Sequence, residues 1–334
     1  MKIALTGIKP TGTPHLGNYL GMIRPALNLA RDYEAYYFIA DYHAMTTVKD
    51  GAELRALSYD VAAVWLALGL DPARVTLYRQ SDIPEVTELT WILACITPKG
   101  LMNRAHAYKA SVDENRERDR DPDAGVNMGL FNYPILMAAD ILLPAANVVP
   151  VGADQRQHLE MTQDMAEAFN ATYGPILTVP EAIIPDDVAT IVGLDGRKMS
   201  KSYGNVIPIF DDPKQLRKTV MRIVTDSRPP DEPKNPEEDT IYQLYRHVAP
   251  PEAASSMAER YLAGGLGYGT AKGELYEALE STFGPARERY QEIVGDRAEI
   301  DRILAGGADR VRARAVPLLE KIRDAVGVCP LPAR

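Results

Sequence analysis

The sequence predicts an α/β protein in which a doubly wound parallel sheet is followed by a smaller all-α domain. In the first half of the 334-residue chain, short apolar segments alternate with helix-like segments, as in sheets whose parallel strands are joined by helices. A glycine-rich turn directly follows the first apolar segment. From about residue 212 onward the pattern is helical and contains no convincing strand.

The predicted elements of the first half follow one another closely. Strands are expected at 3–5, 36–40, 75–78 and 147–151, and helices at 18–31, 52–68, 85–96, 134–142 and 154–168. The glycine-rich turn and the segment 41–44 both follow strands. We expect them on one rim of the sheet, because such folds bind ligands at the carboxyl ends of their strands.

Residues 109–123 form a charge run, in which ten of fifteen residues are Asp, Glu, Lys or Arg. This pattern indicates a solvated insertion or mobile loop, with bounds near 109 and 128. Lys109, the first residue of this run, could reach a phosphate. It could equally be an ordinary surface lysine.

The second half is expected to be helical at 240–249, 251–263, 270–294 and 307–326. Residues 227–239 are acidic and contain four prolines, which indicates a linker or long loop. We therefore expect a first domain over 1–205, a helical domain over 206–306 and a C-terminal helix over 307–334 that packs back on the first domain.

The composition is that of a soluble globular protein, with 46% apolar and 25% charged residues. No apolar run approaches 18 residues, and the N-terminus does not resemble a signal peptide, so we expect no membrane span. Cys95 and Cys329 form no metal or disulfide pattern. This cysteine usage favours the reducing cytoplasm and no structural metal.

The net charge of −9 means that any polyanionic partner must meet a local cationic surface. Segment 301–334 has such an excess, with seven basic residues against four acids. The basic residues are Arg302, Arg310, Arg312, Arg314, Lys321, Arg323 and Arg334. A solvated amphipathic helix explains this segment equally well.

Two short motifs suggest nucleotide chemistry. Lys198 and Lys201 lie three residues apart among small residues, which suits a mobile loop that grips polyphosphate during nucleotidyl transfer. Near the N-terminus, a strand, a glycine-containing turn and a helix would aim backbone N–H groups at phosphate. The turn is not a Walker loop, because no Gly-Lys-Ser/Thr follows.

Together, these motifs resemble the class I aminoacyl-tRNA synthetases. Residues 198–202 read Lys-Met-Ser-Lys-Ser, the signature of that class, and His15-Leu16-Gly17-Asn18 resembles its His-Ile-Gly-His signature with Asn18 replacing the second histidine. Segments 7–12, 133–142 and 149–158 look like bacterial tryptophanyl-tRNA synthetases, in the same order and spacing. The resemblance implies a Rossmann-like catalytic domain.

It also implies the site residues. Catalysis would rest on Lys198, Lys201, His15 and Asn18. ATP would meet Lys9, Pro10, Thr11, Gly17, Asn18, Gly152, Ala153, Asp154, Ile191, Lys198, Met199, Ser200, Lys201 and Ser202. Tryptophan would meet Leu5, Gly7, His43, Tyr133, Met137, Asp140, Val149, Val151 and Gln155. Asp140 corresponds to the carboxylate that accepts the indole N–H, and a carboxylate suits that single donor because it only accepts.

The implied reaction forms tryptophanyl-adenylate from L-tryptophan and ATP with Mg²⁺, and then transfers the tryptophanyl group to tRNA(Trp). Such enzymes are cytoplasmic homodimers whose helical domain reads the anticodon, with no role for DNA or a membrane. Two alternatives stay open: a tyrosyl-specific or other adenylate-forming relative, and a non-catalytic RNA-binding paralogue.

The chain departs from the family pattern at several positions. Lys9 replaces a common Gln, Leu5 a common Phe, and Ala153 a common Glu, while residues 203–205 replace the more usual acidic continuation of the lysine motif. Lys9 adds a positive charge beside the expected tryptophan carboxylate or ATP α-phosphate.

Overall fold

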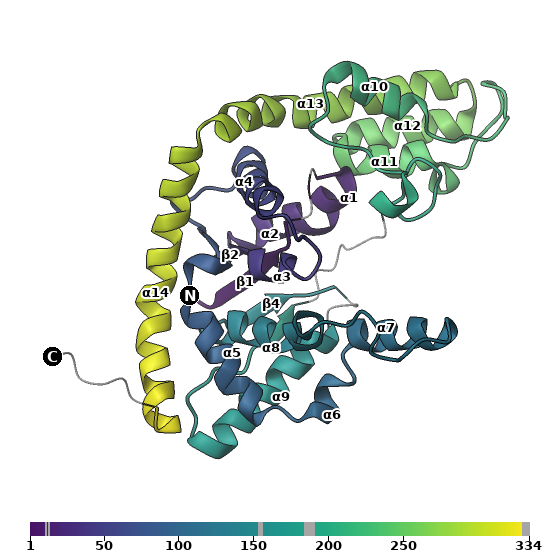
Figure 1. Ribbon diagram of the computed structural model, residues 1–334. Coiled ribbons are helices and arrows are strands. Elements are labelled where there is room, and N and C mark those ends of the chain that lie inside the picture. The colour runs from purple at the N-terminus through teal and green to yellow at the C-terminus, as the bar shows by residue number, and fades with distance from the viewer. Residues whose placement is uncertain (11, 13, 153–155, 184–190, 329–334) are drawn as a thin grey trace.

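The computed structural model describes residues 1–10, 12, 14–152, 156–183 and 191–328. Its centre is a parallel sheet of five strands in the order β3-β2-β1-β4-β5 (Figure 1). The strands are β1 (Ile3–Ile8), β2 (Glu34–Ile39), β3 (Thr76–Arg79), β4 (Val148–Pro150) and β5 (Glu181–Ile183). The α/β fold class is confirmed, and β5 is a strand that the sequence pattern did not indicate.

Helices connect and cover these strands. Between β1 and β2, α1 (Leu16–Asn18), a π-helical turn (Tyr19–Ile23) and α2 (Arg24–Leu29) form one continuous helical segment. The others in this part are α3 (Asp41–Ala44), α4 (Gly51–Ala67), α5 (Glu85–Ile96), α6 (Lys99–Met102), α7 (His106–Glu117), α8 (Met128–Leu142) and α9 (Arg156–Tyr173). Short 3-10 turns occur at Gln80–Asp82 and Lys201–Tyr203.

The charge run at 109–123 is not a loop over most of its length, because α7 spans His106–Glu117. Charged pairs one turn apart, such as Arg118 with Glu114 at 2.8 Å, support the exposed face of this helix. Val112 and Asn115 are buried beneath it, and the Asn115 side chain donates to the carbonyls of Pro122 and Ala124. The high charge density of this run therefore indicates the solvated face of a helix, not a loop.

The sheet buries apolar side chains on both faces. Tyr37 and Ile39 of β2 pack in a cluster with Trp65 of α4 that continues into the C-terminal helices. Tyr36 and Phe38 point the other way, into a cluster shared with α5, α8 and α9. This alternation follows from the two-residue period of a strand.

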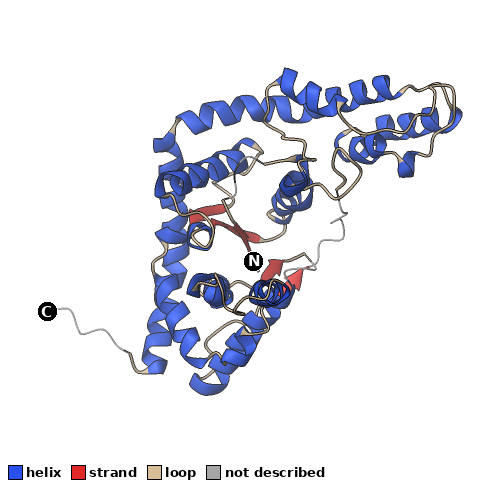
Figure 2. Ribbon diagram, turned by 45° about the vertical axis from the view of Figure 1, so that its right-hand side comes forward, coloured by secondary structure: helices blue, strands red, loops and turns tan. Residues whose placement is uncertain are grey.

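The C-terminal half contains helices and loops, whereas the strands gather in the other body (Figure 2). Its helices are α10 (Pro213–Met221), α11 (Thr240–Val248), α12 (Pro251–Ala263), α13 (Tyr268–Gly295) and α14 (Arg297–Val326), with a 3-10 turn at Pro236–Glu238. No helix in the described part of the chain is long and apolar enough to cross a membrane.

Helix α14 runs back along the sheet and covers its edge strand β3 (Figure 1). It begins ten residues earlier than the expected start at 307. At Gly307 the helix comes so close to β3 that an added Cβ would lie 1.8 Å from the Leu77 carbonyl oxygen. The ion pairs Arg312–Glu85 (2.6 Å) and Arg323–Glu88 join the same helix to α5. Such a cover removes an open sheet edge.

This topology decides where a ligand can bind. The chain leaves β1 toward β2 on one side, and β4 later pairs with β1 on the other side. The strand order thus reverses at β1, and folds of this kind bind their ligands at such a switch point, beyond the carboxyl ends of the strands. The segments that follow β1, β2, β3 and β4 all reach this rim.

Candidate active site

The two sequence motifs are in direct contact. The Gly17 backbone N–H lies 3.2 Å from the Met199 sulfur, although 182 residues separate them. A Cβ on Gly17 would lie 3.0 Å from His15 Nδ1 and 3.3 Å from that sulfur, so only glycine fits without a shift. The structure therefore brings residues 198–202, the lysine turn, into contact with residues 15–18, the histidine turn of the N-terminal helix.

His15 caps this helix as a neutral side chain. Its Nδ1 accepts from the Asn18 backbone N–H at 3.3 Å, while the Asn18 Oδ1 accepts from the His15 N–H at 3.1 Å. Burial, together with the positive charge of Lys201, lowers the pKa of His15 to about 4. Because Nδ1 accepts, the ring proton is on Nε2, where it can be donated to an anion.

Asn205 holds the lysine turn together. Its Oδ1 accepts from the Ser200 N–H at 2.8 Å, and its Nδ2 donates to Lys198 O and to Asp195 Oδ1. Lys201 lies beside the glycine-rich turn, with its Nζ 3.6 Å from where a Cβ on Gly12 would be. Burial lowers the pKa of Lys201. The turn thus carries an ammonium group to the end of β1.

The other residues of the lysine turn make hydrogen bonds through their backbone or their hydroxyl groups. The Met199 N–H donates to the Ile191 carbonyl at 2.8 Å, and the hydroxyls of Ser200 and Ser202 lie 2.8 Å apart. Ile191 and Met199 are buried, so these two residues anchor the turn in the apolar core.

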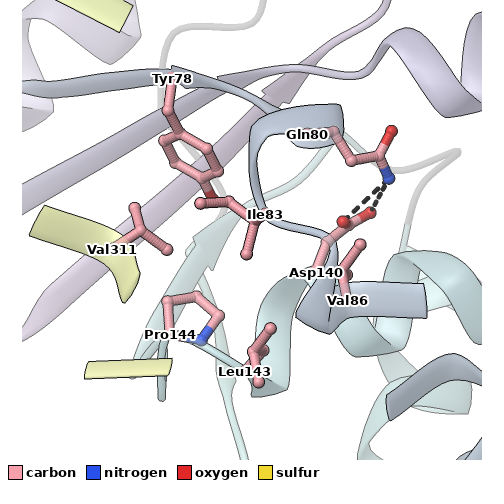
Figure 3. A pocket seen from close by; sticks show the side chains of 8 residues that line it. All are labelled: Tyr78, Gln80, Ile83, Val86, Asp140, Leu143, Pro144 and Val311. Atoms are coloured by element: carbon pink, nitrogen blue, oxygen red, sulfur yellow. Dashed lines mark hydrogen bonds between the residues drawn. The ribbon is translucent and has the colours of Figure 1, made fainter. Parts of the chain in front are cut away.

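A second group of residues lies along α8. Tyr133, Met137 and Asp140 share one face of this helix, at positions i, i+4 and i+7. Asp140 is buried, and the His43 Nε2 atom lies 2.9 Å from its carboxylate. Gln80 Nε2 lies 2.9 and 2.8 Å from the two carboxylate oxygens (Figure 3). Burial raises the pKa of Asp140, and the hydrogen bonds from His43 and Gln80 oppose that rise.

Gln80 is a site residue that the sequence analysis missed. It is 1% exposed, and its Oε1 accepts from the backbone N–H groups of Tyr42 and His43 at 3.1 and 3.4 Å. It therefore joins the start of α3 to Asp140. Its position directly after β3, on the same rim as 41–44, is the signal that could have pointed to it.

A small cavity lies next to Asp140, and its volume is about 10 Å³, room for about one water molecule (Figure 3). It is lined by Tyr78, Gln80, Ile83, Val86, Asp140, Leu143, Pro144 and Val311. Val311 belongs to α14, so the C-terminal helix closes the space beside this carboxylate.

The apolar residues expected around the tryptophan ring lie in or beside the strands. Leu5, Val149 and Val151 are buried. Gly7 is exposed in the central strand β1, and a Cβ there would lie 2.6 Å from the Phe38 ring. An exposed glycine in the middle of a sheet leaves the backbone open to a ligand.

The structure describes some of the remaining expected residues and not others. Tyr133 OH bonds His158 Nε2 at 2.5 Å, and the rings of Tyr133 and His43 are 6.4 Å apart. Lys9 Nζ donates to Thr46 Oγ1 at 3.2 Å, and burial lowers its pKa. Pro10 and Gly152 follow β1 and β4. Lys109 is exposed on α7, and Thr11, Ala153, Asp154 and Gln155 lie outside the described residues.

A neutral histidine turn and a lysine turn that touch at the switch point of a parallel sheet define a class I nucleotidyl-transfer domain. The sequence matches the family model of class I tRNA synthetases (W and Y) over residues 2–284. It is 55% identical to the tryptophan–tRNA ligase of Bordetella parapertussis over 328 residues, which cover 97% of this chain and 72% of that protein. It is 51% identical to the enzyme of Pseudomonas aeruginosa, over 97% of this chain and 73% of the relative.

The fold agrees with a solved structure. Tryptophanyl-tRNA synthetase from Campylobacter jejuni, crystallised with ADP and tryptophan, superposes with a TM-score of 0.89 at 41% identity, over 97% of this chain and 99% of that one. The chain belongs to the class I tRNA synthetases. Within that class it is a member of the bacterial tryptophan–tRNA ligase family.

Proposed function

We propose that this chain activates L-tryptophan with ATP and transfers it to tRNA(Trp). In the first step a tryptophan carboxylate oxygen attacks the α-phosphorus, and the bond to the bridging oxygen breaks to release pyrophosphate. In the second step a ribose hydroxyl of the terminal adenosine, the 2′-OH expected for this subclass, attacks the acyl carbon. AMP leaves, and the hydroxyl proton is lost to solvent. The observation that best supports this proposal is the contact between the histidine and lysine turns.

Catalysis of the first step would rest on charge stabilisation at the phosphates. His15 supplies a neutral N–H donor, and Lys198 and Lys201 supply positive charge to the leaving pyrophosphate. Mg²⁺ would arrive on the ATP phosphates and neutralise their charge, because this ion keeps phosphate oxygens and water as ligands. Among the described residues, no cluster of three or more His, Cys, Asp or Glu side chains suits a resident metal.

Selection of tryptophan would rest on Asp140. A buried, ionised carboxylate can only accept hydrogen bonds, and the indole ring offers one N–H donor. An amino acid without that donor would leave the carboxylate short of a partner, which is costly in a dry site. Met137, Val149 and Val151 would contact the ring, and Tyr133 would contact the amino-acid end.

The tRNA would meet the helical half, which we propose reads the anticodon. Helix α10 and its end expose Lys214, Arg217, Lys218 and Arg222 along one side. Arg217 also lies 5.3 Å above the Tyr276 ring of α13. These four cations give an acidic chain the local positive surface that a polyanion requires.

The arginines of α14 are a weaker choice for this surface. Arg310 donates to Thr76 Oγ1 and to the carbonyls of Pro72 and Val75, and Arg312 pairs with Glu85. Their charges therefore hold α14 on the sheet. Segment 301–334 stays a prediction as a cationic surface for tRNA, but the contacts of Arg310 and Arg312 favour a structural role for these two residues.

We also propose a cytoplasmic homodimer. On α5, Trp91 is 72% exposed, and Cys95 is exposed one turn further along the same face. A large aromatic side chain in water is typical of an interface with another subunit.

Pyrophosphate exchange with a panel of amino acids tests the proposed reaction. Exchange that depends on tryptophan, and is far weaker with tyrosine or phenylalanine, supports it. Equal exchange with tyrosine would favour the tyrosyl-specific alternative, and a lack of exchange with every amino acid would favour a non-catalytic RNA-binding protein.

A further inference from the structure

Gln80 uses both ends of its side-chain amide in the fold. The oxygen accepts from two backbone N–H groups at the start of α3, those of Tyr42 and His43. The nitrogen donates to both oxygens of Asp140, at 2.9 and 2.8 Å. Gln80 itself is 1% exposed, so bulk solvent does not compete for these bonds. The amide therefore links the element that carries His43 to the carboxylate proposed to bind indole.

The groups around Asp140 decide whether its carboxyl group is ionised or protonated. His43 Nε2 of α3 lies 2.9 Å away and favours the ionised form, whereas Asp41 of the same helix disfavours it. The Tyr78 hydroxyl of β3 also lies close enough for the two groups to affect each other's charge. Burial favours the protonated form of Asp140 most strongly. A protonated carboxyl can donate, and its preference as an acceptor for indole is weakened.

We propose that Gln80 is a positioning residue for substrate selection, which keeps Asp140 an ionised acceptor aimed at the indole N–H. The inference rests on the proposed role of Asp140 in tryptophan binding. Only the nitrogen of Gln80 serves this purpose, because its oxygen supports α3. The two ends of the amide thus have separable roles.

The substitution Gln80→Glu tests the role of the amide nitrogen separately from that of the amide oxygen. The substitution keeps the shape and an oxygen for the Tyr42 and His43 N–H groups, but it replaces the donor to Asp140 with a second carboxylate. Two carboxylates at this distance cannot both stay ionised, so the pair should hold a proton to higher pH than Asp140 does beside the amide. Gln80→Met removes both ends and serves as the second variant.

The readout is the ratio of kcat/KM for L-tryptophan to kcat/KM for β-(3-benzothienyl)-L-alanine in pyrophosphate exchange. This analogue has nearly the shape of tryptophan but lacks the ring N–H. The ratio should fall roughly tenfold or more in Gln80→Glu, as for a lost hydrogen bond to a charged group. The acid limb of kcat/KM for tryptophan should also move to higher pH. Gln80→Met should lower the same ratio.

A matched control makes the same chemical change elsewhere. Gln163 on α9 is not an expected site residue; its side chain donates to the Pro180 carbonyl, and Gln163→Glu should leave the ratio and the pH limb unchanged. If both Gln80 variants lower the melting temperature and change the kinetics of the two amino acids by the same factor, Gln80 is only structural and the proposal is wrong.

The proposed role of Asp140 is tested by a different variant. Asp140→Asn should lower the ratio on its own, whatever Gln80 does. An unchanged ratio in Asp140→Asn would remove Asp140 from the site, whereas a lowered ratio there with unchanged ratios in both Gln80 variants would overturn only the role of Gln80.

Discussion

Gly17 and Met199 are in contact, with the glycine N–H 3.2 Å from the methionine sulfur. This contact fixes the distance between the two motifs on which nucleotide chemistry depends. The same contact places the lysine turn beside the histidine turn, with Lys201 next to Gly12 and both Lys198 and Lys201 still exposed to solvent. The first prediction concerns what those lysines do there.

Lys198→Ala and Lys201→Ala should each lower kcat for tryptophan activation by roughly 100-fold or more, because each removes a positive charge from the leaving pyrophosphate. Pyrophosphate exchange measures this rate. Lys214→Ala, which removes an exposed lysine of α10, is the control and should retain the normal rate. Normal exchange in both loop variants would remove the lysines from the reaction.

His15 should make stability depend on pH in a defined direction. Its pKa is lowered to about 4 in the folded protein from an ordinary value of 6.5. Between these values the unfolded chain binds a proton that the folded chain does not, so acidification from pH 6.5 to 4 lowers the free energy of unfolding. His15→Gln should therefore reduce that decline. Urea unfolding at pH 7.5 and 4.5 measures it, and an identical decline in both proteins would contradict the buried, neutral state.

Gly307→Ala should destabilise the protein by about 1–3 kcal/mol or more, because the new Cβ would overlap the Leu77 carbonyl and push α14 from β3. Gly306→Ala is the matched control, since a Cβ there meets nothing within 4 Å. It should be neutral or slightly stabilising. Denaturant unfolding compares the two, and equal stabilities would show that α14 does not approach the edge strand this closely.

Replacing Lys214, Arg217, Lys218 and Arg222 together by Gln should weaken aminoacylation through KM for tRNA, while pyrophosphate exchange stays normal. Each contact with a phosphate releases counterions, so the slope of log affinity against log salt should become shallower by about 3. Arg302 and Lys321 of α14, both replaced by Gln, form the control. Unchanged tRNA affinity in the α10 variant would show that another surface binds the nucleic acid.

Local patterns predicted much of the fold. Helix α12 (Pro251–Ala263) has the expected bounds, because Pro starts it and two glycines follow it. Helix α14 was expected only from residue 307, since Gly306-Gly307 looks like a break in a helix. The structure shows why glycine occurs at 307: only a residue without a Cβ lets α14 approach the Leu77 carbonyl this closely. That reason lies in a distant strand and is invisible locally.

The site shows the same limit. Residues such as His15, Met199 and Asp140 could be proposed from the sequence because their neighbours in sequence carry the motif. Gln80 has no such neighbours, and its importance comes from bonds to residues 38 and 60 positions away. Strand β5 was missed because Glu181–Ile183 is short and mostly exposed, so it lacks the apolar run of a buried strand.

The most direct test concerns the indole N–H and Asp140. In pyrophosphate exchange, kcat/KM for tryptophan should greatly exceed that for β-(3-benzothienyl)-L-alanine in the unmodified protein. In Asp140→Asn this ratio should fall roughly tenfold or more, and Asp140→Ala should lose about 2–4 kcal/mol in kcat/KM for tryptophan. The free energy of unfolding of Asp140→Asn should change little, because the substitution removes a buried charge but its NH2 group cannot accept from Gln80 or His43. A large loss of stability with an unchanged ratio would contradict the account.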